Sequence, residues 1–143
     1  MSARISPAPD FEALRREILS LHQDLIHAHL EGNADSLVEG QSEGFLSVSA
    51  GEIRRPTVEE TREKLGTYLR NSTFTEYRYV CEPIVNLSQD GSLAWSVAQV
   101  KVAGTRRTED GSLRPLDFVC AWVTVFERRD DRWVRVAEVS TFA

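Results

Sequence analysis

The segment LDFVCAWVTVF, residues 116–126, constrains the fold more than any other part of this 143-residue chain. Its β-branched and aromatic residues predict a strand, but the residues on both faces of that strand are apolar. An antiparallel sheet with one face in water alternates apolar and polar residues, so both faces of this sheet must be covered. Helices of the same chain can cover one face. In a chain this short, we expect a second copy of the chain to cover the other.

The period of the apolar residues changes from helical to extended at Thr73. The helices predicted before it span residues 9–31, 33–39 and 56–71, and a short strand with a turn separates the last two. The strands predicted after it span residues 74–87, 92–107, 114–127 and 132–142. Pro83 lies inside the first of these strands and predicts an edge or a bulge there. Helices followed by an antiparallel meander indicate one α+β domain over residues 1–143.

Charge and cysteine content argue against several kinds of partner and site. The formal net charge of −5 disfavours nucleic acid and anionic membrane surfaces as partners. The N-terminal residues hold no apolar core of signal-peptide length and no segment is long enough to span a membrane, so we expect a cytoplasmic protein. The two cysteines are too few for a disulfide framework or a zinc site. No cofactor motif is visible, and we expect neither a cofactor nor a metal.

All three histidines lie in the segment SLHQDLIHAHLEG of the first predicted helix. A chelating pair on a helix needs a spacing of three or four residues, whereas His22 and His29 lie roughly 10 Å apart along the axis. His27 is expected on the polar side. One apolar face of the helix is predicted to hold Phe11, Leu14, Ile18, Leu21 and Leu25. His22, at the margin, and His29, near the centre, fall within this stripe, either as core histidines satisfied by a neighbour or as imidazoles facing a ligand.

The last predicted strand, RWVRVAEVSTF, carries a carboxylate on a row that should face the core. Alternation places Val134, Val136, Glu138 and Ser140 on this one face. A buried carboxylate is uncommon unless it is paired or functional, and the alternative is a surface position near the strand end. Paired with His29, Glu138 would form an acid–base or orienting pair.

Further segments carry a family resemblance: HLEGNADSLV, FLSVSAGEIRRPTVEE, SLAWSVAQVKVAG, DFVCAWVTVFER and DDRWVRVAEVSTF. In this order they resemble the nuclear transport factor 2-like superfamily, and within it the SnoaL-like group, from about Phe11 to Phe142. The resemblance implies a curved antiparallel sheet wrapped around the long first helix, two shorter helices that close a cone-shaped pocket, and a homodimer through the convex face. The superfamily contains enzymes and non-enzymes, so the fold alone does not give the function.

The resemblance also implies which residues line the pocket. The residues of ketosteroid isomerase that do its chemistry correspond to Leu25, to a position near Ser49, and to Cys120 or Trp122, and none of those side chains is retained here. The implied pocket row is Phe45, Ser47, Ser49, Ser96, Ala98, Val100, Phe118, Cys120, Trp122, Val136, Glu138 and Ser140. Trp95, Val97 and Gln99 are left for the convex face.

The sequence therefore predicts a homodimeric α+β cone with a mostly apolar pocket for a small organic ligand. As an enzyme, it would catalyse cofactor-free proton transfer on an apolar carbonyl compound, as an isomerase, cyclase or dehydratase, with His29 and Glu138 as the catalytic residues. The residues expected to contact the ligand are Leu25, Ser49, Ser96, Cys120, Trp122 and Ser140. The alternative is a non-catalytic homodimeric binding or interaction module whose pocket is filled by its own side chains.

Overall fold

The computed structural model describes residues 7–143, which form three helices and a sheet of seven strands, so the predicted α+β class is confirmed. The helices are α1 (Phe11–Glu31), α2 (Ala34–Val38) and α3 (Val58–Arg70). The strands are β1 (Gln41–Ser49), β2 (Glu52–Arg54), β3 (Ser72–Tyr79), β4 (Ile84–Leu87), β5 (Leu93–Arg107), β6 (Leu113–Arg129) and β7 (Arg132–Phe142). No helix among these residues is both long enough and apolar enough to cross a membrane.

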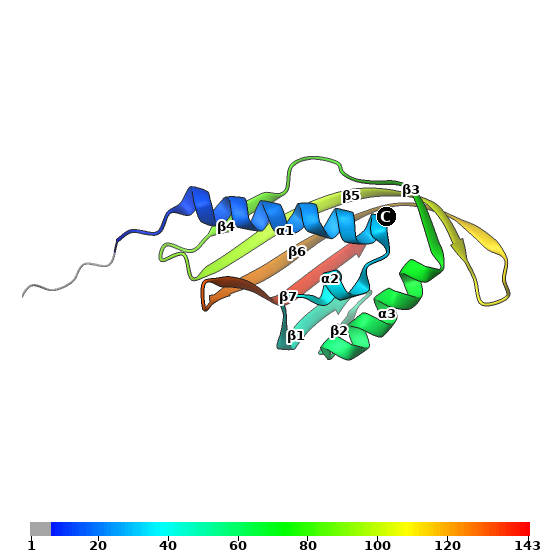
Figure 1. Ribbon diagram of the computed structural model, residues 1–143, viewed down its shortest axis with the longest axis horizontal. Coiled ribbons are helices and arrows are strands. Elements are labelled where there is room, and N and C mark those ends of the chain that lie inside the picture. The colour runs from blue at the N-terminus through cyan, green and yellow to red at the C-terminus, as the bar shows by residue number, and fades with distance from the viewer. Residues whose placement is uncertain (1–6) are drawn as a thin grey trace, which may run out of the picture.

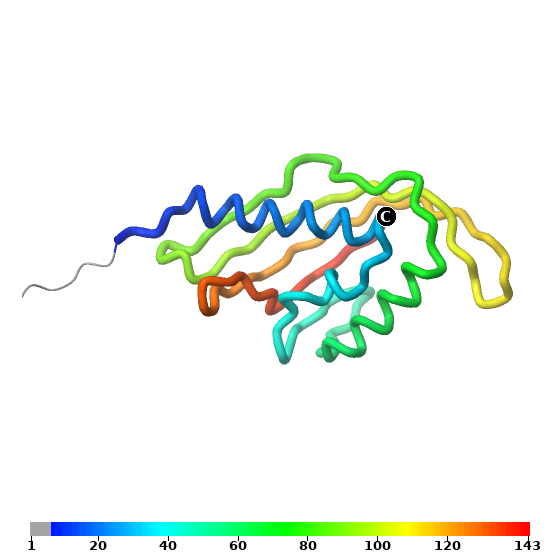
Figure 2. Tube along the Cα trace, in the orientation of Figure 1, coloured from blue at the N-terminus to red at the C-terminus, as the bar shows by residue number. Residues whose placement is uncertain are grey.

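The sheet is mixed and curved, and the helices lie on one side of it. The strand order is β2-β1-β7-β6-β5-β3, with β4 also paired to β5, and β1 with β7 is a parallel pair. Figure 1 shows α1 and α2 lying over the same face of the sheet. Figure 2 shows that the β5–β6 hairpin continues past α3 and curls at its tip. The helices and the curved sheet together enclose the inner side of a cone.

Local signals in the sequence explain where the helices begin and end. Asp10 precedes α1 and accepts a hydrogen bond from the backbone N–H of Ala13 at 3.1 Å, and Gly32 ends the helix with a φ of 70°. The capping box predicted before α3 is present, because Thr57 and Glu60 each accept the other's backbone N–H.

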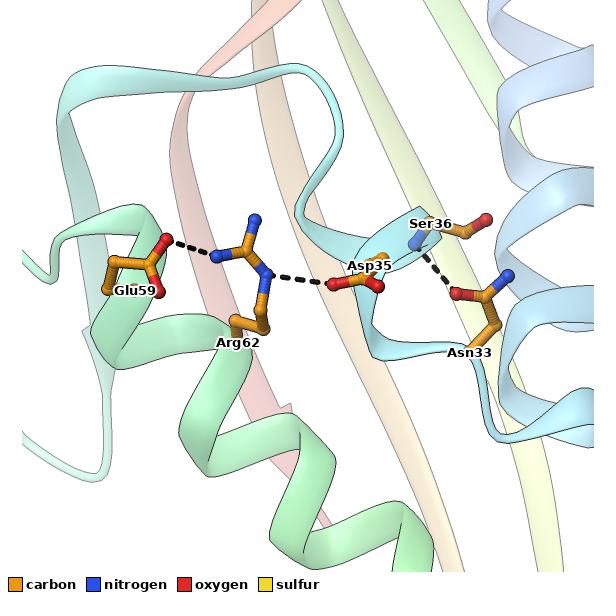
Figure 3. Close-up of polar contacts among 5 residues, drawn as sticks. All are labelled: Asn33, Asp35, Ser36, Glu59 and Arg62. Atoms are coloured by element: carbon orange, nitrogen blue, oxygen red, sulfur yellow. Dashed lines mark hydrogen bonds and ion pairs between the residues drawn. The ribbon is translucent and has the colours of Figure 1, made fainter.

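Arg62 of α3 fastens this helix to α2, as Figure 3 shows. Its Nε lies 2.8 Å from Oδ1 of Asp35, and its Nη1 pairs with Glu59 on its own helix. Asn33 caps the start of α2 by accepting the backbone N–H of Ser36 at 3.1 Å. These contacts position a helix of only five residues, which is too short to be stable alone.

The strand predicted over residues 74–87 is two strands, β3 and β4, which both pair with β5. Tyr79 pairs with Val100 and Ile84 with Val97, so the connection over residues 80–83 contains more residues than β5 provides opposite it. Pro83 lies in this connection and lacks the N–H that a ladder needs. The irregularity predicted at Pro83 is therefore confirmed, although it divides the strand rather than bending it.

The inner face of the sheet forms the core, and the predicted assignment of β5 residues to faces is confirmed. Ser96, Ala98 and Val100 are buried, whereas Trp95 is 44% exposed on the outer face. The predicted apolar face of α1 is wrong in part, because Ile18 is completely buried but Leu21 and Phe11 are each 41% exposed. The helix is rotated so that His22, only 4% exposed, packs on the sheet where Leu21 was expected.

Candidate functional site

A cavity of about 740 Å³ lies between α1, α2 and the strands β6 and β7. Its apolar walls are formed by Leu21, Leu25, Leu37, Trp122, Phe126 and Trp133. Polar groups on the same walls belong to His22, Thr124, Arg135 and Glu138. The volume, and walls that combine leucine and aromatic side chains with polar groups, suit a small organic molecule.

A β-bulge in β7 brings Arg135 and Glu138 to the same side of the sheet. Phe126 of β6 pairs with Arg135, and the residue before it, Val125, pairs with Ala137. Val136 therefore has no partner in β6 and is an extra residue in β7. Regular alternation would place residues three apart on opposite faces. The bulge cancels that alternation, and both side chains line the cavity. The sequence pattern missed Arg135 for this reason.

Arg135 is a largely buried guanidinium held at the end of α2. Its Nη2 donates to the carbonyl oxygens of Leu37 at 2.6 Å and Glu39 at 3.2 Å, where α2 leaves its last carbonyls without helical partners. Burial lowers the pKa of Arg135, and the charge of Glu138 opposes this shift. An arginine keeps its charge in such surroundings, so Arg135 brings a fixed positive charge to the cavity wall.

Glu138 is the carboxylate that the sequence predicted on the pocket face, and it does line the cavity. Burial of the carboxyl group raises the pKa of Glu138, while Arg135 and the hydroxyls of Thr124 and Ser140 act in the opposite direction. The net shift is upward because desolvation of the carboxylate is the largest effect. A carboxyl group in this state is a stronger base than one in water.

His22, rather than His29, is the histidine on the cavity wall beside this pair of charges. The hydroxyl of Tyr79 donates to the backbone carbonyl of His22 at 2.6 Å, so its oxygen can only accept from Nδ1, 3.2 Å away. Nε2 is therefore the unprotonated nitrogen, and the hydroxyl of buried Ser96 donates to it at 2.9 Å. This network assigns a neutral Nδ1–H tautomer.

Burial, with the charge of Arg135, lowers the pKa of His22 to about 4. In the unfolded chain the imidazole of His22 is protonated near pH 6.5, well above its pKa in the folded protein. Acidification from neutral pH therefore stabilises the unfolded state first.

We expect wild-type protein to lose about 2 kcal/mol more free energy of unfolding between pH 7 and pH 4.5 than His22→Gln does. Urea unfolding at the two pH values measures this. His27→Gln, a change at an exposed histidine, should lose as much as wild type. Equal losses in wild type and His22→Gln would contradict the depressed pKa.

His29 lies against the aromatic side chains of β3. Its ring stacks on Tyr77 with 4.4 Å between centroids, and its Nδ1 lies 2.8 Å from the carbonyl oxygen of Leu25. Burial lowers the pKa of His29, and the bond to Leu25 opposes the shift. Within residues 7–143, no hydrogen bond or ion pair joins His29 to Glu138, so the predicted contact between them is not formed. His27 is exposed, as predicted, and borders the cavity.

The predicted ligand-contacting residues divide into three groups. Leu25 and Trp122 line the cavity. Ser96 lies beneath His22, and Ser140 contacts the carboxyl of Glu138, so both support the wall from behind. Cys120 packs in the apolar cluster that contains Trp122, and burial raises the pKa of its thiol to about 11. Ser49 is the last residue of β1 and pairs with Glu52 of β2.

The metal-ligating residue types are dispersed over the described part of the chain. Among residues 7–143, no three histidine, cysteine, aspartate or glutamate side chains come together in a group that could hold a metal ion.

Comparison with known proteins places the fold. No family model matches the chain, and no curated protein matches it. Among solved structures, it is similar to a nuclear transport factor 2-like protein from Cytophaga hutchinsonii, with a TM-score of 0.70, 17% identity, and coverage of 90% of this chain and 98% of that one. A protein from Streptomyces avermitilis, provisionally named as a dehydratase of this family, matches with a TM-score of 0.69 and 10% identity over 90% and 95% of the two chains.

A third structure, a protein from Shewanella frigidimarina provisionally named as a ketosteroid isomerase, has a TM-score of 0.62 and 16% identity over 85% of this chain and 92% of that one. Similarity at these identities concerns the fold and leaves the chemistry of each site to be argued separately. The chain has the α+β cone fold of the nuclear transport factor 2-like superfamily.

Proposed function

We propose that the chain binds a small, mostly apolar carbonyl compound in the cavity between α1 and β7 and moves a proton on it without a cofactor. The observation that carries this proposal is the carboxyl of Glu138, which lines a cavity walled by leucine and aromatic side chains and has its pKa raised by burial. General bases work best when their pKa lies near the pH at which they operate, and burial moves a glutamate in that direction.

The proposed step is enolisation. The carboxylate of Glu138 takes a proton from the carbon next to the carbonyl. The electron pair of that C–H bond forms a C=C bond to the carbonyl carbon, and the π pair of the C=O bond moves to the oxygen to give an enolate. The resulting carboxylic acid then returns the proton to the same carbon or to another one. An isomerase, a cyclase or a dehydratase can each use this step.

The imidazoles are poorly suited to be the base. The lone pair of His22 Nε2 is held by the hydroxyl of Ser96, and its pKa of about 4 makes it a weak base. His29 keeps one nitrogen on the carbonyl of Leu25 and its ring on Tyr77, so we assign it no proton transfer. The provisional names of two structural neighbours, a dehydratase and a ketosteroid isomerase, support the same general chemistry.

The test uses 1-tetralone, a bicyclic ketone with exchangeable protons beside its carbonyl. Wild-type protein in D₂O should accelerate deuterium uptake at that carbon, followed by proton NMR. Glu138→Gln keeps the shape but cannot accept the proton, so the accelerated rate should fall at least about tenfold. The control is Glu43→Gln on β1, an exposed glutamate, which should exchange like wild type.

The opposite result identifies the competing class. If 1-tetralone binds but wild-type protein does not accelerate exchange, the chain would act as a non-catalytic binding module, the alternative that the sequence left open. If wild type accelerates exchange and Glu138→Gln does so equally, Glu138 is not the base.

We also infer that the protein works as a homodimer through the outer face of the sheet. Register partners across the strands form a continuous apolar row on this face: Ile84, Val97, Val123, Val139, Val48 and Ile53. Ile53 is 75% exposed and Ile84 is 54% exposed. Contiguous apolar surface of this kind is typical of protein interfaces, and a second copy offers an identical surface.

A further inference from the structure

The guanidinium of Arg135 and the carboxyl of Glu138 belong to the same wall of the cavity. They are three positions apart in β7, and the extra residue at Val136 brings them to one side of the strand. In the described part of the chain no hydrogen bond or ion pair joins the two groups, so Arg135 acts on Glu138 through its charge. Burial raises the pKa of Glu138, and the charge of Arg135 is the largest effect that opposes it.

The other titratable groups that face Glu138 are uncharged at neutral pH. Burial, with the charge of Glu138, raises the pKa of the Cys120 thiol on β6 to about 11. Burial also raises the pKa of Tyr77 on β3, where the charge of Glu138 adds a smaller effect. His22 on α1 shares the cavity wall, and its pKa of about 4 leaves it neutral. Within the described residues, Arg135 is therefore the one countercharge beside this carboxyl.

The remaining charges of the cavity lining lie at its exposed edge and are mostly negative. Arg132 is the exposed arginine there, and the exposed carboxylates are those of Glu17, Asp24, Glu31, Glu39 and Asp131. Negative charges in front of a buried carboxyl favour its protonated form, as burial itself does. Without the charge of Arg135, Glu138 would keep its proton and could not accept another.

Arg135 is held in place by α2 rather than by Glu138. Its Nη2 donates to the carbonyl oxygens of Leu37 and Glu39 at the end of this helix. The helix is fastened in turn to α3 by the ion pair shown in Figure 3. The positive charge therefore stays where it is when Glu138 gains or loses a proton, and an arginine keeps that charge when it is buried.

We propose that Arg135 is a positioning residue for the proton transfer, whose fixed charge keeps the carboxyl of Glu138 ionised and so able to take a proton from the substrate. This inference rests on the proposed function and adds the group that sets the pH at which the cavity works. Arg135 acts through Glu138 and makes no contact with the reacting carbon.

The test follows the carboxyl of Glu138 by ¹³C NMR in protein with ¹³C-labelled glutamate, where Glu138→Gln identifies its signal. Arg135→Met removes the charge and should move the midpoint of this titration upward by about one pH unit or more. Arg135→Lys keeps a positive charge and should restore most of the shift. Arg132→Met removes an exposed arginine from the same strand and should leave the midpoint within about 0.3 pH units of wild type.

A measurement on the wild-type chain makes the test independent of how Arg135→Met folds. The Nε–H of Arg135 is buried, which shields its proton from exchange with solvent. In protein with ¹⁵N-labelled arginine, its signal should move with the midpoint of the Glu138 carboxyl and should stop titrating in Glu138→Gln. An unchanged Glu138 midpoint in Arg135→Met, or a lysine variant that behaves like the methionine variant, would overturn the inference.

Deuterium uptake by 1-tetralone separates this inference from the proposed function. In Arg135→Met, the pH of half-maximal exchange should rise by the same amount as the carboxyl midpoint. If wild type accelerates exchange and that pH is the same in both proteins, the role of Arg135 alone is wrong. If wild type accelerates no exchange at any pH, the proposed function fails, and with it the reaction that Arg135 is proposed to serve.

Discussion

Gly104→Ala is expected to lower the free energy of unfolding by roughly 3 kcal/mol or more. Gly104 has a φ of 154° and pairs with Phe74 where the register of β3 shifts. A Cβ added here would overlap the carbonyl oxygen of Thr73 and would lie 2.9 Å from the Cα of Phe74. These are backbone atoms, so the overlap is relieved only by moving β3 away from β5.

Urea unfolding of the purified variant measures this effect. Gly111→Ala is the matched control, because Gly111 also has a positive φ, 82°, but a Cβ there meets nothing within 4 Å. It should cost only about 1 kcal/mol, the ordinary penalty of alanine in that backbone conformation. If the two variants were equally stable, the close approach of β3 to Gly104 would not be a constraint on the fold.

Val123→Asp is expected to convert the proposed homodimer into monomers. Val123 lies in the middle of the apolar row on the outer face, paired with Val97 on one side and Val139 on the other. A carboxylate at this position would be buried without a partner in the dimer, which should weaken association about a thousandfold. The monomer exposes the same position to water, so its fold should be retained.

Sedimentation equilibrium at micromolar concentration distinguishes the two states. Wild-type protein should give twice the chain mass of 16.1 kDa, and Val123→Asp should give the mass of one chain. Leu30→Asp places the same charge on an exposed apolar position of α1 and should leave the dimer intact. A wild-type monomer, or a Val123→Asp dimer, would show that the outer face is not the interface.

Short-range patterns predicted most of the fold because they depend on neighbours in the sequence. The capping box of Thr57 and Glu60, the turns between strands, and the division of β5 between a buried and an outer face all follow from local chemistry and the period of two. The interruption at Pro83 follows from a missing N–H. Each of these features needs no knowledge of the distant partner.

The candidate site was predicted less well, because it depends on long-range register. His22 and His29 share one stripe of α1, and which of them faces the cavity depends on how far the helix lies along the sheet. The period of the apolar residues shows which side of the helix faces the core, but it does not show how far along the sheet the helix lies. The sequence placed Glu138 on an inward row, and its side chain lines the cavity. Trp133 and Arg135 were missed, since the register shift beside Val136 appears only when β6 is laid against β7.

The extra residue at Val136 has a consequence for comparing this chain with its structural relatives. In a relative whose last strand is regular, the residues before this point lie one step out of phase with those of β7. An alignment without a gap there would compare Trp133 and Arg135 with side chains on the outer face of the sheet. The guanidinium and the carboxyl of this site would then seem never to occur together, even in a protein that has both. A search for proteins with the same chemistry must therefore allow one inserted residue in the last strand.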